Sequence, residues 1–325
     1  MKAAWYEEIG PAAQVLKLGT MPEPVPREGE VRVRIMASGV NPSDVKTRAG
    51  RPMIAPRIIP HSDGSGVIDQ VGQGVSPERV GERVWLWNGQ WQRSAGTAAE
   101  FITVPSNQAV LLPENTSFAE GACLGIPALT ALRALTCDGP VAGQTVLISG
   151  GAGAVGAYAI QFARLLGAAV IITTVSSSKK AEMVHQLGAD HVINYRDEDT
   201  VARIKSITGG RGVDRVVEVD AGSNAKWLPS IIAKDGLVVI YGSSTPQVSF
   251  DFGPMIISGA VVRFFIVYEL SESVRRQCVS ALNAYLDAGL LNHLVAASYQ
   301  LDEVAQAHQA VESGQVIGNV VIELG

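Results

Sequence analysis

The middle of the chain alternates short apolar runs with stretches of helical periodicity. Residues 145–149 form an apolar run typical of a buried strand, and residues 154–166 repeat apolar side chains at helical spacing before Gly167. Residues 169–175 supply the next apolar run. The alternation continues with predicted helices at 178–187, 199–207 and near 225–233, and with predicted strands at 192–194, 213–219, 237–241 and 260–267. This order predicts a parallel sheet with helices on both faces.

The first 120 residues or so follow a period of two instead. Val31, Val33 and Ile35 alternate with Arg32 and Arg34, as in a half-buried strand. Further strand candidates are residues 2–5, 67–72, 83–87, 100–104 and 109–112. Frequent Gly and Pro between such short strands favour a compact β-rich barrel.

The last part of the chain returns to this first domain. We expect a helix at 272–288, an extended piece at 295–299, a helix at 305–312 and a final strand at 319–323. A chain of 325 residues exceeds what one core usually holds. The fold class is therefore α/β with two domains, one built from residues 1–121 and 269–325 and a doubly wound, Rossmann domain at 122–268.

A glycine cluster marks the candidate binding site of the second domain. Gly151, Gly153 and Gly156 have the G-x-G-x-x-G spacing between a predicted strand and a predicted helix. We interpret the first glycine as permitting a tight turn, the second as admitting a pyrophosphate, and the third as packing the helix close to the strand. The helix N-terminus offers N–H groups and partial positive charge to the phosphates.

Composition narrows the function class. The net charge of −5 argues against a nucleic-acid-binding surface. The three cysteines, Cys123, Cys137 and Cys278, form no C-x-x-C pair and suit a reducing compartment. No apolar run reaches transmembrane length, and the first eight residues carry acid where a signal peptide would be apolar. We expect a cytoplasmic protein that binds neither membrane nor nucleic acid.

Several stretches together give the chain a family resemblance. They are residues 37–44, 62–68, 124–135, the glycine cluster and residues 188–195. Over its whole length the chain resembles the zinc-independent medium-chain dehydrogenase/reductases, and among them the NADPH:quinone reductases related to zeta-crystallin. The resemblance implies a GroES-like catalytic domain, an inserted Rossmann domain, and a cofactor in the cleft between the two.

The end of the second strand bears on the choice of cofactor. NAD-binding Rossmann units place an acid there to hold the ribose 2′-hydroxyl. Here residues 175–180 contain serines and two lysines instead, which suits a 2′-phosphate. Ser176 belongs to this stretch, and Lys180 and Tyr195 match family positions that contact the adenosine phosphate. The alternative for Lys179 and Lys180 is a solvated first helical turn, although positive charge there is mildly unfavourable. We predict NADPH.

The resemblance also implies the other site residues. Asn41 would bond the nicotinamide ribose or a quinone oxygen, and Thr130 would lie beside the nicotinamide; the alternatives are an Asn turn before Pro42 and a helix residue bonded to its own backbone. Gly242 and Ser243 end a strand at the carboxyl edge of the sheet, where Rossmann ligands bind. The remaining positions taken as cofactor contacts are Ala154, Val155, Phe265, Val267 and Asn319.

No zinc site is expected. Zinc dehydrogenases of the superfamily use Cys, His and Cys ligands. The first ligand position falls within residues 38–41, which lack cysteine. His61 lies one residue before the histidine position of the family's Gly-His-Glu motif, so that Ser62 and Asp63 occupy its His and Glu places. Without a Lewis acid, alcohol oxidation is disfavoured, whereas a quinone or activated alkene accepts hydride directly.

Two departures from the family pattern add candidates. Lys46 stands where relatives commonly carry Tyr, and its ammonium could stabilise an oxyanion or donate a proton, or simply lie exposed at the cleft rim. The loop at 87–93 looks longer than in relatives, and Trp87 and Trp91 could wall an aromatic acceptor, cover the barrel or meet another subunit.

The predicted function is NADPH-dependent reduction of a small-molecule quinone. Reduction of α,β-unsaturated carbonyls is the same chemistry on another acceptor, and an NADPH-binding structural or regulatory protein is the alternative of a different class. The apolar run at 261–267 forms an edge strand that invites pairing, and the resemblance implies a homodimer through it.

Overall fold

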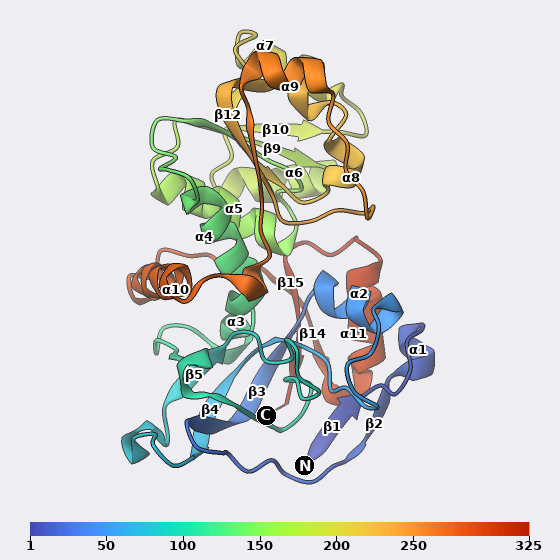
Figure 1. Ribbon diagram of the computed structural model, residues 1–325, viewed down its shortest axis with the longest axis vertical. Coiled ribbons are helices and arrows are strands. Elements are labelled where there is room, and N and C mark those ends of the chain that lie inside the picture. The colour runs from blue at the N-terminus through green and yellow to red at the C-terminus, as the bar shows by residue number, and fades with distance from the viewer. Residues whose placement is uncertain (325) are drawn as a thin grey trace. The chain divides into compact units, whose positions relative to one another are not determined.

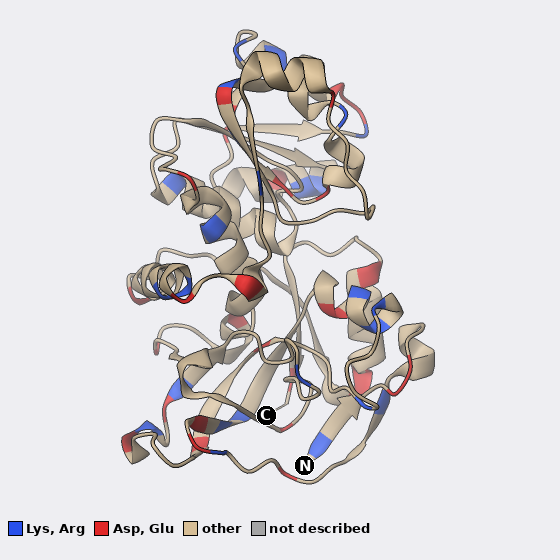
Figure 2. Cartoon of the chain, viewed as in Figure 1, with Lys and Arg blue, Asp and Glu red and all other residues tan. Residues whose placement is uncertain are grey.

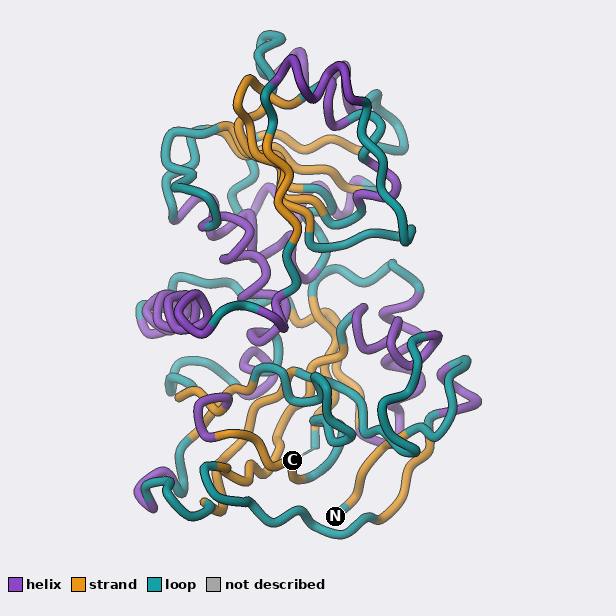
Figure 3. Tube along the Cα trace, viewed as in Figure 1, coloured by secondary structure: helices purple, strands orange, loops and turns teal. Residues whose placement is uncertain are grey.

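The structure, a computed structural model, describes residues 1–324 as two compact units. One comprises residues 1–127 and 279–325, the other residues 128–278. These boundaries lie a few residues further along the chain than those expected from the sequence. Figures 1 and 3 show the elements of each unit.

The second unit is built on a six-stranded parallel sheet (Figure 1). Its strands are β8 (Thr145–Ile148), β9 (Val170–Val175), β10 (His191–Asn194), β11 (Val213–Glu218), β12 (Ile232–Ile240) and β13 (Val261–Phe264). They lie in the order β10-β9-β8-β11-β12-β13, and every neighbouring pair is parallel. The direction of winding reverses between β8 and β11, which is the switch point where Rossmann sheets bind their ligands. The predicted doubly wound sheet is confirmed.

Helices connect the strands of this unit, and several of them pack on the sheet. They are α4 (Leu129–Thr136), α5 (Ala154–Leu165), α6 (Ser178–Gln186), α7 (Thr200–Ile207), α8 (Ala221–Asn224) and α9 (Phe252–Ser258), with 3-10 turns at Leu228–Ser230 and Val267–Glu269. α5 contacts β8 and β9, α6 contacts β9 and β10, and α9 contacts β12. The core contains the fully buried Leu147, Ile172 and Val216.

Two predictions for this unit were wrong. No helix covers 225–233: α8 ends at Asn224, and Ile232 already starts β12 by pairing with Val213. Pro229 lies within the intervening 3-10 turn, where its missing N–H would interrupt a longer helix. The strand predicted at 260–267 ends at Phe264, because its partner β12 ends at Ile240.

The other unit is β-rich. A seven-stranded sheet contains β3 (Glu30–Val40), β4 (Asp63–Val71), β5 (Arg83–Leu86), β6 (Phe101–Pro105), β7 (Ala109–Leu111), β14 (Val295–Gln300) and β15 (Asn319–Glu323). β1 (Lys2–Trp5) and β2 (Lys17–Thr20) pair separately. β3 pairs with β4 along one edge and with β6 and β15 along the other, and register shifts interrupt its ladder with β4. Val31, Val33 and Ile35 are buried, as their period of two predicted.

Helical segments complete this unit. They are α1 (Ala12–Val15), α2 (Pro42–Gly50), α3 (Phe118–Gly121), a π-helical turn (Leu124–Ala128), α11 (Val304–Glu312) and 3-10 turns at Pro77–Arg79, Ser106–Gln108 and Leu301–Glu303. α10 (Glu272–Asp287) spans the boundary at residue 278. The sequence did not predict α2, whose residues are mostly polar. Within residues 1–324, no helix combines the length and the apolar character needed to cross a membrane.

Candidate functional site

The glycine turn follows β8 and leads into α5, as predicted. A methyl group built on Gly151 would lie 2.0 Å from Thr173 Oγ1, and one on Gly156 would lie 2.3 Å from the Gly150 carbonyl oxygen. Both glycines are therefore required by packing. The turn itself corrects the prediction, because the left-handed backbone (φ +69°) belongs to Gly150 rather than to Gly151.

Gly153 differs from its neighbours. A methyl group there would meet nothing nearer than 3.4 Å, at the Gly150 carbonyl oxygen. No atom of the protein demands a glycine at this place, so the open space is available to a ligand. Gly153 caps α5, and the N–H groups of Ala154, Val155 and Gly156 have no helical acceptor. This arrangement fits a pyrophosphate.

The ends of β9 and β10 form a basic edge. Asn194 pairs with Val175, so Tyr195 and Ser176 follow at the same end of the sheet. Ser177 caps α6 by accepting the N–H of Lys180. Burial lowers the pKa of Lys180, and the positive charge of Arg196 lowers it further.

Arg196 was missed by sequence reasoning. Its side chain is exposed, and its charge acts on Lys180 across the ends of the two strands. The neighbouring acids Asp197 and Glu198 accept hydrogen bonds from Asn194. Asp197 accepts its side-chain amide and Glu198 accepts its backbone N–H. Two cations beside hydroxyl groups are well suited to a 2′-phosphate. The only sequence signal was a basic residue next to Tyr195.

The carboxyl ends of β8, β11 and β12 hold a buried acid that the sequence did not reveal. Glu218 Oε2 accepts the hydroxyl of Ser149 at 2.7 Å, and its Oε1 accepts the N–H of Asp220 and the amide of Asn224. Burial raises the pKa of Glu218. This carboxyl ties β8 to β11 at the switch point. An acid directly after the apolar pair Val216 and Val217 was the available clue.

The remaining predicted residues of this unit follow β12 or β13 or lie on α4. Gly242 follows β12, where a methyl group would lie 2.2 Å from the Val219 carbonyl oxygen. The hydroxyl of Ser243 donates to the Thr245 carbonyl within its own loop. Beyond β13, Phe265 is half-buried and Val267 is buried, and Thr130 is buried on α4.

The candidate residues of the β-rich unit are Asn41 after β3, Asn319 on β15 and Lys46 on α2. Val40 pairs with Val320, which places Asn41 and Asn319 opposite each other. The Asn319 amide donates to the Leu294 carbonyl. Lys46 lies exposed on α2.

Asn41 is a buried N-cap of α2. Its backbone N–H donates to Asp44 Oδ2 at 2.8 Å, and its side-chain Nδ2 donates to Asp63 Oδ2 at 2.9 Å. Asp63 also accepts the backbone N–H of Ile126. One amide hydrogen of Asn41 is thus committed to Asp63, which orients the group. Burial raises the pKa of Asp44 to about 7, against the lowering effect of its bonds from Asn41.

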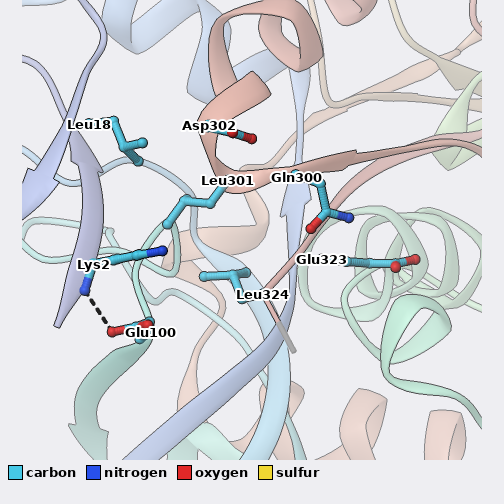
Figure 4. Close-up of a pocket in the computed structure, with 8 residues that line it drawn as sticks. All are labelled: Lys2, Leu18, Glu100, Gln300, Leu301, Asp302, Glu323 and Leu324. Carbon is cyan, nitrogen blue, oxygen red and sulfur yellow. Dashed lines mark hydrogen bonds between the residues drawn. The ribbon is translucent and has the colours of Figure 1, made fainter.

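A ligand could also bind at a metal site or in another pocket. Among residues 1–324, no three His, Cys, Asp or Glu side chains come together in a way that could hold a metal. A separate pocket of about 290 Å³ is lined by Lys2, Leu18, Glu100, Gln300, Leu301, Asp302, Glu323 and Leu324 (Figure 4). It contains no predicted site residue. In the loop at 87–93, Trp87 and Trp91 are half-buried.

Comparison with known proteins identifies the family. A family model described as "Zinc-binding dehydrogenase" matches residues 154–284, and one described as "Alcohol dehydrogenase GroES-like domain" matches residues 27–114. The quinone oxidoreductase of Sus scrofa is 30% identical over 93% of this chain and 91% of its own. The chain belongs to the zinc-independent quinone oxidoreductases of the medium-chain dehydrogenase/reductases.

Solved structures of quinone oxidoreductases have the same fold over their whole length. Escherichia coli quinone oxidoreductase complexed with NADPH is 26% identical, with a TM-score of 0.88 over 100% of both chains. A mycobacterial protein complexed with NADPH is 27% identical, with a TM-score of 0.89 over 100% of both chains. The chain is thus an NADPH-dependent oxidoreductase acting on a small molecule. The glycine turn and the basic edge are the parts that fit this cofactor.

Proposed function

We propose that this oxidoreductase reduces quinones without a metal. The observation that carries the proposal is the basic edge at Lys180 and Arg196, combined with the quinone oxidoreductase family. The edge favours NADPH over NADH, and NADPH supplies the hydride when it is bound. A quinone is already electrophilic, so it needs no Lewis acid to accept that hydride.

The protein's own part is orientation and proton supply. Asn41 would face the acceptor or the nicotinamide ribose with its side-chain amide, whose plane is set by the bond to Asp63. Lys46 lies exposed on the same helix and would donate the proton that the reduced oxygen requires. We assign Thr130, Phe265 and Val267 to the nicotinamide end of the cofactor.

We further propose a homodimer through the edge of the Rossmann sheet. β13 has a partner only on its β12 side in the described chain. Val261 and Phe264 are exposed on it, and α9 exposes Phe252, Ile256 and Ile257, the last by 82%. α9 carries no charged residue (Figure 2). Such an exposed apolar patch beside an open strand edge suits a protein interface.

The dimer is tested by light scattering of the wild type and of Phe264→Lys/Ile257→Lys. A dimeric wild type and a monomeric variant are expected, and a monomeric wild type would refute the interface. We place the protein in the cytoplasm, where its three free, buried cysteines would remain reduced.

The activity is tested by following NADPH oxidation with a 1,4-quinone, a 1,2-quinone and an alkenal, each with a chelator present. Turnover of the quinones is expected, with Lys46→Met slower and its NADPH affinity unchanged. Turnover of the alkenal alone would reassign the enzyme to enone reduction. Tight NADPH binding without any turnover would instead indicate a binding protein.

A further inference from the structure

A row of buried polar side chains crosses the β-rich unit behind Asn41. It consists of His308 on α11, His61 before β4, Ser38 on β3 and Thr97, and each of the four is 0% exposed. His308 Nε2 and His61 Nε2 are 2.9 Å apart, and His61 Nδ1 is 2.9 Å from Ser38 Oγ. Ser38 Oγ is 2.7 Å from Thr97 Oγ1, which donates to the Asp63 carbonyl oxygen at 2.5 Å. We call these four side chains the buried row.

Only one placement of hydrogens satisfies the whole row. The Thr97 hydroxyl gives its hydrogen to a carbonyl, so Ser38 must donate to Thr97. Ser38 then has no hydrogen for His61, so the His61 Nδ1–H donates to Ser38. The His61 Nε2 is consequently an acceptor, and His308 Nε2–H donates to it. The hydrogen bonds all run in one direction, from α11 towards Asp63.

His61 occupies its place under backbone strain. Its φ is +77°, in the left-handed region that few residues other than glycine adopt, although Asn, Asp and His occur there more often than the rest. Strain of this kind, of order 1–3 kcal/mol, persists where surrounding contacts hold it and is found at functional sites. The imidazole's two hydrogen bonds are those contacts.

The row ends beside the amide of Asn41. The residue whose carbonyl accepts from Thr97 is Asp63, and the same residue's carboxylate accepts from Asn41 Nδ2. Backbone hydrogen bonds fix the segment from His61 to Asp63. The Thr97 N–H donates to the His61 carbonyl, and the Gly89 N–H donates to the Ser62 carbonyl. A shift of His61 would therefore move Asp63 and turn the amide of Asn41.

We infer that His61 is a positioning residue that acts through Ser38, Thr97 and Asp63 to hold the amide of Asn41 for the acceptor. This inference rests on the proposed function. The row remains uncharged at working pH, because burial lowers the pKa of His61 and of His308. Two protonated rings would also repel each other, which lowers the pKa of His61 further, and Arg48 lowers the pKa of His308 further.

Two substitutions of His61 separate the two halves of the row. In His61→Asn the side-chain N–H replaces Nδ1–H and keeps the bond to Ser38, and Asn tolerates a left-handed backbone. In His61→Gln the longer amide reaches His308 instead and leaves Ser38 without its donor. We expect His61→Gln to lower kcat for the quinone by about tenfold to a hundredfold, as for a misplaced catalytic group. His61→Asn should stay within about twofold, and NADPH affinity should be unchanged in both.

A second pair of substitutions is made at Thr97, whose backbone is not in the left-handed region. Thr97→Val removes the hydroxyl between Ser38 and Asp63, and Thr97→Ser restores it. We expect Thr97→Val to lose activity like His61→Gln and Thr97→Ser to recover it. If kcat follows melting temperature rather than the presence of the Ser38–Thr97–Asp63 bonds, or if His61→Gln is as active as wild type, the inference is overturned.

A readout independent of turnover distinguishes this inference from the proposed function. The side-chain amide resonance of Asn41 in a ¹H–¹⁵N spectrum, assigned by its loss in Asn41→Asp, reports the bond to Asp63. It should move in His61→Gln and Thr97→Val and stay in place in His61→Asn and Thr97→Ser. An inert wild type with this pattern would refute quinone reduction alone, whereas an Asn41 resonance unmoved in all four variants would refute the positioning role.

Discussion

Gly153→Ala should weaken NADPH binding at least tenfold and leave the fold intact. Gly153 has φ −79° and ψ 169°, which alanine adopts readily, and the nearest protein atom would be 3.4 Å from the new methyl group. Losing a glycine from the unfolded chain stabilises by about 0.4–1 kcal/mol, and placing alanine at an N-cap costs a similar amount. The free energy of unfolding should therefore change by less than about 0.5 kcal/mol.

Gly156→Ala is the matched control. Its methyl group would lie 2.3 Å from the Gly150 carbonyl oxygen, about 1 Å closer than contacts allow. Overpacking of this kind costs about 1–3 kcal/mol, and each kcal/mol lowers the melting temperature by about 2–4 °C in a unit of the size of residues 128–278.

Thermal melts and NADPH titrations of both variants test the contrast. Gly153→Ala should melt with the wild type and bind NADPH at least tenfold more weakly, a loss of about 1.4 kcal/mol or more. Gly156→Ala should melt several degrees lower. Wild-type NADPH affinity in Gly153→Ala, or destabilisation equal to that of Gly156→Ala, would show that the open space beside Gly153 is not where the phosphates bind.

Three further outcomes are expected. Arg196→Met and Lys180→Met should each weaken NADPH binding by about tenfold while leaving the weaker NADH binding unchanged, since only NADPH carries the 2′-phosphate; an equal loss for both cofactors would contradict the assignment of the basic edge. Arg215→Met should destabilise the Rossmann unit by about 3 kcal/mol in urea melts, because the buried guanidinium donates to the carbonyls of Ala134, Leu135, Cys137 and Gly139; wild-type stability would show these bonds to be dispensable. The pKa of His308 is lowered to about 3 in the folded protein, from about 6.5 in the unfolded chain. Its neutral ring therefore contributes fully to the free energy of unfolding above about pH 6.5. That contribution falls as the pH drops, by about 2 kcal/mol at pH 5. Urea melts should show the wild type losing that amount of stability relative to His308→Gln between pH 7.5 and pH 5. The raised pKa of Asp44 changes stability in the opposite direction, but equally in both proteins, so it cancels in the comparison. If the free energies of unfolding of the two proteins changed with pH in parallel, the buried neutral imidazole would be contradicted.

The sequence predicted those features that depend on neighbouring residues. Apolar runs gave the strands of the Rossmann unit, and the spacing of Gly151, Gly153 and Gly156 located the turn, because both signals lie within a few residues. The helix α2 escaped notice because its residues are mostly polar and only Val45 gives it an apolar side. At 225–233 helical spacing was misleading, since Leu228 and Ile232 are buried by the sheet and not by a helix.

The parts of the site that could not be predicted depend on long-range contacts. His61 and His308 are 247 residues apart in the chain, and no local pattern links them. Arg196 and Lys180 meet only because β9 and β10 are neighbours in the sheet. Glu218 was visible as an acid at the end of a strand, but its role follows from Ser149 on the adjacent strand end.

The pairing of β15 with β3 also has a consequence for how the chain is made. Residues 128–278 form a contiguous unit that can fold while synthesis continues. The β-rich unit cannot, because β15, which follows the Rossmann unit in the chain, supplies a neighbour for residues 37–40 of β3. Asn41 and its partner strand therefore come together only after β15 has left the ribosome. A chain truncated before residue 319 would emerge with a finished cofactor-binding unit and an unpaired edge on β3.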